Sequence, residues 1–357
     1  MSGVCCTGAA TFRLGCAKTI RSEGENCLTE KTLGEFELIE KLFAPLADGF
    51  PGALNLKDDA ALVPVSPGCR LVVTTDALVA GVHFRPDDPP DLVARKALRV
   101  NLSDLAAMGA KPLGLLVAAC FPKDASESWL TAFAKGLAQD KAEFNVPIIG
   151  GDTVSTPGPF TLAVTALGEV EEGRAFKRSG ARAGDAILVS GTIGDGALGL
   201  DALEGKLDFL FEDERKWLAE RYLLPRPRLD LGQALAAKRL VHAGMDISDG
   251  LLADLGHIAR ASGLAAIVET VKIPLSSPTR AALKADSNRM AQILGGGDDY
   301  ELLLTAEPRD VPALQEIAQS CRLSLTVIGR MEEGEGVRAV DAAGVSLAAG
   351  PSGWRHF

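Results

Sequence analysis

Residues 71–84 read LVVTTDALVAGVHF, an apolar and β-branched run that ends in two hydroxyls and a carboxylate. The run predicts a largely buried strand. Thr74, Thr75 and Asp76 stand where that strand ends. Hydroxyl and carboxylate oxygens are ligands that Mg²⁺ prefers, usually in company with substrate phosphates. We therefore interpret this strand end as the rim of a magnesium–phosphate site.

Other carboxylates follow apolar runs or stand beside glycines along the whole chain. Taken alone, each is typical of a turn or an N-cap, and Asp249 is placed to cap the helix that follows it. Gathered in one cleft, such groups would repel each other by about 1–4 kcal/mol per pair, and divalent cations would offset that repulsion. The set comprises Asp58, Asp59, Asp76, Asp104, Asp152, Asp246, Asp249, Asp298 and Asp299.

Composition excludes several classes of protein. A net charge of −10 and a pI of about 5.1 argue against a nucleic-acid surface, and no apolar run is long enough to predict a membrane span. None of the seven cysteines forms a CxxC pair, which favours a cytoplasmic protein without zinc. Residues 1–30 lack the long apolar region of a signal peptide, so we expect a flexible N-terminal extension.

The order of elements predicts an α/β or α+β fold in two domains. Glycine-rich, charged residues 171–185 separate the domains, which we expect to span 31–172 and 173–357. Periodicity predicts helices over 34–46, 91–109, 126–144, 249–263 and 310–322. It predicts strands over 56–65, 70–78, 114–122, 146–153, 160–170, 265–275, 300–307 and 323–331, and a strand–turn–helix over 186–200.

A rival interpretation starts from GDGALG at 194–199, which matches GxGxxG between a predicted strand and a predicted helix. That context is typical of a dinucleotide site in a nicotinamide or flavin enzyme. No second strand ending in an acid follows about 20 residues later, so a plain strand–helix turn is favoured. Among the histidines, His83 lies seven residues after Asp76 and is the better site candidate, whereas His257 reads as structural.

Several stretches together resemble the thiamine-monophosphate kinase family, which belongs with aminoimidazole ribonucleotide synthetase and selenophosphate synthetase in one superfamily. The resemblance runs in family order from residue 34 to residue 357 and leaves only the N-terminal extension outside. The matching stretches are GEFELI, KDDAAL, TTDALVAGVHF, KALRVNLSDLAAMGAKP, IIGGDT, KRSGARAGD, YLLPRPRL, DISDGLLADLGHI, GGGDDYEL and GWRHF.

The resemblance implies a role for each matching position. It implies catalysis around Asp76, Asp104, Asp152 and Asp246, and ATP contacts from Gly151, Asp152, Arg178 and Ser248. It implies thiamine-phosphate contacts from His83, Asp298 and Trp354, where Asp298 replaces the usual Glu and Trp354 a commoner Tyr or Phe. It implies magnesium ligation by Asp59, Thr74, Thr75, Asp76, Asp104, Asp152, Asp246 and Asp249.

The implied fold has an N-terminal domain that pairs with its twin into a dimeric β-barrel, and a C-terminal α+β domain. The implied reaction is direct in-line transfer from ATP to thiamine monophosphate, with several Mg²⁺ ions and no nucleic-acid or membrane partner. Three alternatives stay open: another ATP-dependent synthetase of the superfamily, an NAD-binding oxidoreductase that uses GDGALG, and a non-catalytic nucleotide- or metal-binding protein.

Overall fold

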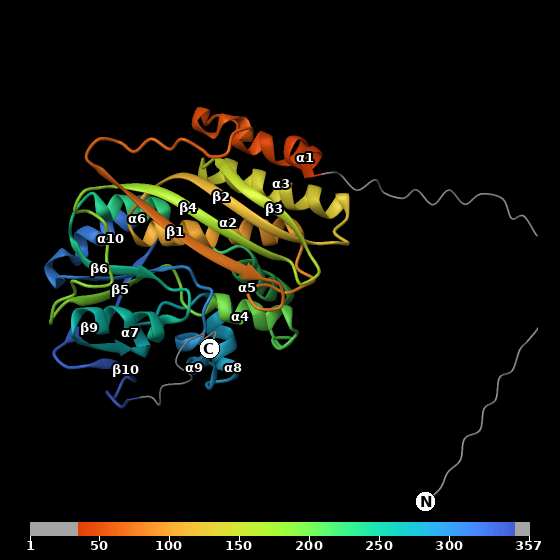
Figure 1. Cartoon of the computed structure of the whole chain (residues 1–357). Helices are drawn as coiled ribbons and strands as arrows, with labels where there is room; N and C mark the ends of the chain where they lie inside the picture. Colours follow the sequence, from red (N-terminus) through yellow and green to blue (C-terminus); the bar gives the residue numbers. More distant parts are fainter. Residues whose placement is uncertain (1–34, 347–357) are drawn as a thin grey trace, which may run out of the picture. The chain divides into compact units, whose positions relative to one another are not determined.

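The computed structural model describes residues 35–346 (Figure 1). The predicted extension over residues 1–30 and the predicted substrate residue Trp354 lie outside that range. Within it, no helix is long and apolar enough to cross a membrane.

The N-terminal half of the chain forms a four-stranded sheet with the strand order β1-β4-β2-β3. β4 pairs antiparallel with both β1 and β2, and β3 runs parallel to β2. The strands are β1 (Cys69–Val79), β2 (Lys111–Pro122), β3 (Ile148–Thr156) and β4 (Thr161–Glu171), which confirms the four strands predicted here. The prediction that β1 is largely buried is wrong, because it is an edge strand of this sheet and most of its side chains are exposed. The sheet is open at β1 and β3, so these residues contain no closed barrel.

Two long helices, α2 (Pro90–Ala107) and α3 (Glu127–Phe144), pack on one face of this sheet and confirm the predicted helices. Gly109, with φ +67°, ends the first helical region in the left-handed conformation that glycine tolerates. The Ser126 hydroxyl caps the second by accepting a hydrogen bond from the Trp129 backbone N–H.

The segment before β1 differs from its prediction. Residues 56–65 form no strand, since Pro64 cannot donate a ladder hydrogen bond and two adjacent acids occupy the middle of the run. The predicted helix over 34–46 forms as short turns of mixed type rather than as one α-helix. These are α1 (Glu35–Leu38), the π-helix η1 (Ile39–Phe43) and the 3₁₀ turns η2 (Ala44–Ala47) and η3 (Pro51–Leu56).

A six-stranded mixed sheet carries the C-terminal half, in the order β10-β7-β9-β5-β8-β6. Its strands are β5 (Ala186–Ser190), β6 (Val241–Asp246), β7 (Ala265–Glu269), β8 (Leu302–Ala306), β9 (Leu325–Glu332) and β10 (Gly336–Val340). Its helices are α4 (Asp195–Leu203), α5 (Glu212–Leu223), α6 (Leu229–Ala236), α7 (Leu251–Ser262), α8 (Ser277–Ala285), α9 (Arg289–Gly295) and α10 (Val311–Ser320), with 3₁₀ turns η4 (Thr270–Lys272) and η5 (Pro308–Asp310).

Helix α2 joins the two halves, because it contacts β1 and β4 on one side and α6 and β6 on the other. One hydrophobic core runs from Leu98 and Leu102 of this helix to Leu304 of β8. Polar side chains of the same helix are therefore buried, among them Lys96, Asn101 and Ser103. Polar groups in such a place need partners, and those partners define the site.

Candidate functional site

The middle of β1 meets α2 through polar contacts. The strand continues to Val79, so the prediction that it ends at Thr74–Asp76 is wrong. Side chains alternate along a strand, so Thr74 and Asp76 face the same side of the sheet, toward α2. The Thr74 hydroxyl donates to Asp104 Oδ2 at 2.6 Å, and the Asp76 backbone N–H donates to Asn101 Oδ1 at 3.1 Å. Asn101 and Asp104 share one helix face because they are three residues apart.

The end of β6 meets the same helix one position away. The Ser103 hydroxyl donates to Asp246 Oδ2 at 2.6 Å, and both residues are buried. The middle of β1 and the end of β6, which belong to different sheets, thus bring Asp76 and Asp246 to one helix. We call Thr74, Asp76, Asp104 and Asp246 the inner carboxylate cluster.

Negative charge accumulates in this cluster. Burial, followed by the charge of Asp246, raises the pKa of Asp104 to about 7. Burial raises the pKa of Asp246 to about 6, and the charges of Asp254 and Asp76 add to that rise. The pKa of Asp76 is also raised, first by partial removal of water and then by the charge of Asp249. A cation placed here would relieve this repulsion.

The turn between β6 and α7 holds Ser248 and Asp249 beside the cluster. Asp254 Oδ2 accepts hydrogen bonds from the backbone N–H groups of Ser248, Asp249 and Gly250 at 3.0, 3.1 and 3.1 Å. Asp254 rather than Asp249 therefore satisfies the start of α7, and the capping interpretation of Asp249 is wrong. The sequence analysis missed Asp254, although an acid in the first turn of a helix is a usual signal for this role.

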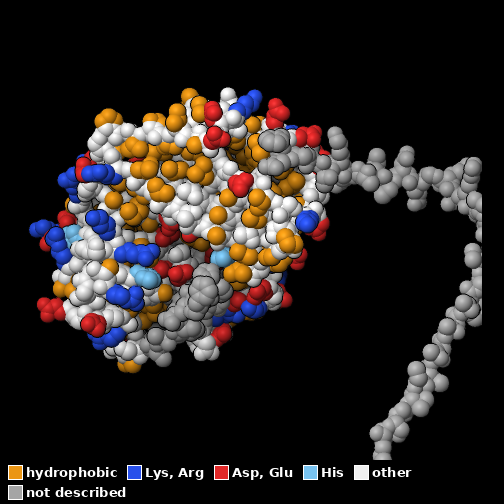
Figure 2. Space-filling view, viewed as in Figure 1, with side chains coloured by type: hydrophobic (Ala, Val, Ile, Leu, Met, Phe, Trp, Pro, Cys, Tyr) orange, Lys and Arg blue, Asp and Glu red, His pale blue; other side chains and the backbone are white. Residues whose placement is uncertain are grey.

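Positive groups border the cluster on one side. The guanidinium of Arg178 lowers the pKa of Asp104, although burial and Asp246 outweigh it, and it also contributes to a lowered pKa at His257, where burial is the larger cause. His257 was predicted to be structural, yet it lies close enough to the site to sense both Arg178 and Asp249. Figure 2 shows acidic side chains gathered in a hollow, with Lys, Arg and His side chains around it.

His83 lies just after β1, where its Nδ1 accepts a hydrogen bond from the Val79 backbone N–H at 3.0 Å. That contact keeps Nδ1 unprotonated and leaves the proton of a neutral ring on Nε2. A positive charge on His83 would lower the pKa of Asp76, so the ring lies near the end of β1. The predicted site residue therefore stands beside the inner carboxylate cluster.

Asp298 reaches the site from a glycine-rich loop after α9. Its Oδ1 lies 3.1 Å from the Nζ of Lys96, whose side chain is only 3% exposed. The same ammonium lies 3.5 Å from the centre of the Tyr222 ring. The sequence analysis missed Lys96. The signal was its spacing, since Lys96 precedes Ser103 by seven residues, about two helical turns, and therefore lies on nearly the same helix face, about 11 Å away along the axis.

The other predicted ligands lie on the opposite face of the first sheet. Thr165 donates to the Thr75 hydroxyl at 3.0 Å, and Thr165 also lines a cavity of about 620 Å³ between the sheet and the N-terminal turns. Asp59, Gly151 and Asp152 line the same cavity. The structure therefore brings Thr74, Asp76, Asp104, Asp246 and Asp249 into one neighbourhood, and it places Thr75, Asp59 and Asp152 in another.

Within the described part of the chain, no three His, Cys, Asp or Glu residues are arranged as a ready metal site. The inner carboxylates instead receive hydroxyl hydrogen bonds from Thr74 and Ser103. All the predicted donors are nevertheless oxygens. Mg²⁺ commonly binds through one or two carboxylates together with waters and substrate phosphates, so this donor set fits it.

The GDGALG segment begins at the turn after β5 and continues into α4, which confirms the predicted strand–turn–helix. Its backbone N–H groups at Gly194 and Gly196 donate to the Asp299 carboxylate at 2.8 and 3.0 Å. These are the groups that would bind a pyrophosphate in a dinucleotide site. A buried carboxylate of the protein already holds them, which favours the structural interpretation of this segment.

The N-terminal domain of AIR synthase related proteins matches residues 57–170, and the C-terminal domain of the same family matches residues 182–342. The thiamine-monophosphate kinase of Caulobacter vibrioides is 42% identical over 325 residues, covering 90% of each chain. The chain belongs to the AIR synthase related family and, within it, to the thiamine-monophosphate kinases.

Solved structures agree with this assignment. The thiamine-monophosphate kinase from Stenotrophomonas maltophilia superposes with a TM-score of 0.77 at 42% identity, covering 86% of this chain and 96% of that one. AaThiL, complexed with AMPPCP and TMP, superposes with a TM-score of 0.71 at 34% identity, covering 91% of this chain and 97% of that one.

Proposed function

We infer that this chain phosphorylates thiamine monophosphate to thiamine diphosphate with ATP, the last step of thiamine diphosphate biosynthesis. The observation that carries this function is its near full-length relation to thiamine-monophosphate kinases, including a relative complexed with AMPPCP and TMP. The acceptor phosphate is already an anion near neutral pH, so it needs little help from a general base. It needs relief from repulsion by the phosphates of ATP.

We propose direct in-line transfer at the inner carboxylate cluster. The cluster residues Thr74, Asp76, Asp104 and Asp246, with Asp249 beside them, would hold Mg²⁺. Bound Mg²⁺ supplies charge neutralisation and alignment of the phosphates. Ser103 keeps Asp246 oriented, and Thr74 does the same for Asp104.

Asp59, Thr75 and Asp152 remain proposed ligands, although they line or border the cavity on the other sheet face. We assign ATP to contacts with Gly151, Asp152, Arg178 and Ser248. Arg178 suits this role because its guanidinium lies near the cluster and its planar fork of N–H donors matches phosphate oxygens.

The thiamine end of the acceptor is assigned to His83, Asp298 and Trp354. A carboxylate such as Asp298 favours a cationic or N–H-donating heterocycle and repels a phosphate. The acceptor would therefore point its phosphate toward the metal end of α2 and its rings toward the Lys96 end. Trp354 lies outside the described residues, and its role rests on the family resemblance.

We propose a homodimer in which two copies of the four-stranded sheet form a barrel. Hydrophobic side chains on the sheet face away from α2 support it: Leu71, Val73 and Val154 are 46%, 56% and 46% exposed. Figure 2 shows such side chains spread over the region that the sheet occupies in Figure 1. Light scattering would show a dimer, and Val73→Asp would weaken it. The predicted domain limits, 31–172 and 173–357, and a cytoplasmic location also remain proposals.

The function is tested by incubating the purified chain with ATP, Mg²⁺ and thiamine monophosphate and measuring thiamine diphosphate and ADP. Equal amounts of both products are expected, and chelation of Mg²⁺ should abolish them. The proposal fails if no thiamine diphosphate forms while a known family member is active in the same assay.

A further inference from the structure

Residues 298–301 carry an unusual backbone at the edge of the site. Asp298 and Tyr300 have φ angles of +68° and +51°, a region that side-chain-bearing residues rarely adopt. Such a conformation persists only where the surroundings enforce it. The buried residues between and after them, Asp299 and Glu301, supply that enforcement.

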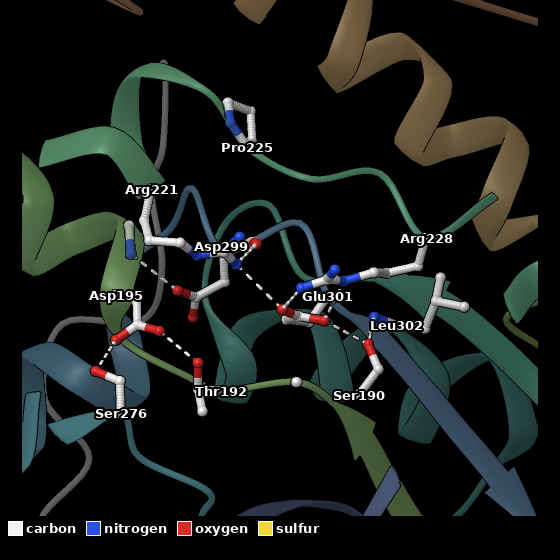
Figure 3. A network of polar contacts seen from close by, with 12 residues as sticks. Ser190, Thr192, Asp195, Arg221, Pro225, Arg228, Ser276, Asp299, Glu301 and Leu302 are labelled. Atoms are coloured by element: carbon white, nitrogen blue, oxygen red, sulfur yellow. Dashed lines mark hydrogen bonds and ion pairs between the residues drawn. The ribbon is translucent and has the colours of Figure 1, made fainter. Parts of the chain in front are cut away.

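Asp299 and Glu301 are held by polar groups from several neighbouring segments (Figure 3). Asp299 is 1% exposed and accepts hydrogen bonds from two backbone N–H groups at the start of α4. Glu301 is fully buried and accepts from the Ser190 hydroxyl and from the guanidinium groups of Arg221 and Arg228. Arg228 binds both oxygens of this carboxylate, with its Nε 2.7 Å from Oε2.

Asp298 faces the substrate side instead, whereas Tyr300 packs against the hydrophobic core. Asp298 Oδ1 lies 3.1 Å from the Lys96 ammonium. Burial and then the charges of Asp298, Asp246 and Asp76 raise the pKa of Tyr300, so its ring lies near the inner carboxylate cluster. The loop thus places one side chain, Asp298, at the site between the glycines before it and the buried carboxylates of Asp299 and Glu301.

The backbone of the loop is also tied to the metal side of the site. The N–H groups of Asp298 and Tyr300 donate to the carbonyls of Ser248 and Ile247 at 2.9 and 2.7 Å. A Cβ on Gly297 would lie 2.2 Å from the Ser248 carbonyl oxygen, so only glycine permits this approach. Any displacement of residues 298–300 would therefore move groups both at the acceptor end of the site and near Asp249.

A buried carboxylate paired with two arginines is weak support for stability, since hydrophobic residues would often serve as well. Its two-point geometry does fix an orientation. We propose that Glu301, held by Arg221 and Arg228, is a positioning residue that keeps the backbone left-handed at Asp298 and Tyr300 and so places Asp298 for the heterocyclic end of the acceptor. This inference rests on the proposed function, because it takes thiamine monophosphate as that acceptor.

The test compares two arginines of one loop. Arg228→Met removes two of the hydrogen bonds to Glu301, while Arg221 and Ser190 still satisfy this carboxylate. Arg226→Met is the matched control, since Arg226 forms only a 3.3 Å surface ion pair with Glu220, both side chains being more than half exposed. Arg228→Lys tests rescue, because an ammonium restores the charge but not the two-point contact.

The measurements are the Kd for thiamine monophosphate without ATP, the KM for each substrate, and Tm. Arg228→Met should raise the Kd for thiamine monophosphate about fivefold or more and leave the KM for ATP within about twofold, with Arg228→Lys intermediate. Arg226→Met should change none of them. If Arg228→Met raises the Kd for thiamine monophosphate and the KM for ATP by the same factor, or changes neither, Arg228 is only a packing residue and the inference is wrong.

A double-mutant cycle tests whether Arg228 affects binding of thiamine monophosphate through Asp298 or independently of it. In an Asp298→Asn background, Arg228→Met should change the Kd for thiamine monophosphate by less than about twofold, because both changes act through one residue. Additive losses of affinity for thiamine monophosphate in the double mutant would overturn the proposal. A crystal structure of Arg228→Met in which φ stays positive at Asp298 and Tyr300 would also overturn it. Failure of the proposed function is seen separately, as a wild-type chain that makes no thiamine diphosphate.

Discussion

Ser103 of α2 and Asp246 of β6 meet through a hydrogen bond of 2.6 Å in the buried interior, and this contact joins the two halves of the chain at the proposed metal site. The neighbouring residue, Asp104, accepts from Thr74 of the other sheet. One turn of one helix therefore orients carboxylates that the chain supplies from far apart.

Ser103→Ala should weaken Mg²⁺ binding more than it weakens the fold. Loss of the hydroxyl leaves a buried carboxylate short of one partner, at a cost of about 1–3 kcal/mol. We expect the Mg²⁺ concentration for half-maximal activity to rise several-fold. Ser128→Ala, on the exposed side of α3, is the control and should have no effect. A fall in Tm with unchanged Mg²⁺ dependence would mean that this serine only stabilises the interior.

Asp76→Asn should lower kcat by about two orders of magnitude or more, since it removes a metal-binding charge and keeps the size of the side chain. The fold should survive, because the Asp76 contact to Asn101 uses the backbone N–H rather than the carboxylate. Steady-state kinetics at limiting and saturating Mg²⁺ check this, with the exposed Asp87→Asn as control. Near-normal activity at limiting Mg²⁺ would show that Asp76 is not a ligand.

The chain should bind neither NAD(H) nor FAD at GDGALG. The backbone N–H groups of Gly194 and Gly196 are already bound to Asp299, and a dinucleotide would have to displace a buried carboxylate. Calorimetric titration should show no saturable binding, with Mg²⁺–ATP as the positive control on the same sample. Tight binding of either dinucleotide would restore the oxidoreductase interpretation.

Trp354→Ala should raise the KM for thiamine monophosphate and leave the KM for ATP nearly unchanged. An indole face binds a flat cationic ring with about 0.5–2 kcal/mol, depending on how much water is removed. Trp354→Phe should lie between wild type and alanine. If Tm falls and the KM values for both substrates rise by the same factor, this tryptophan packs against the protein and does not bind substrate.

A chain that starts at Lys31 should keep its activity and solubility. The predicted core-forming periodicity begins near Gly34, and the family match begins at residue 57. Thiamine diphosphate formation and size-exclusion chromatography check this against the full chain. Loss of either property would give residues 1–30 a role that the sequence does not predict.

Local sequence was enough for most elements and for the chemistry of the site. Apolar periodicity predicted β1 and α2, and the hydroxyls and acids that accompany apolar runs predicted a site built from oxygen ligands, although Thr74–Asp76 lie in the middle of β1 and not at its end. It failed over residues 56–65, where an apolar run suggested a strand. A strand needs a partner, and pairing is a property of the fold rather than of the run itself.

Only the folded chain separates the ligands into two neighbourhoods, with Thr74 and Asp76 toward α2 and Thr75 toward the cavity on the other side. Adjacent residues of a strand point to opposite faces, and which face meets which helix depends on how the sheets pack. Lys96, Arg228 and Glu301 stayed unnoticed for the same reason. Their roles come from partners distant in sequence, and tertiary packing alone brings these together.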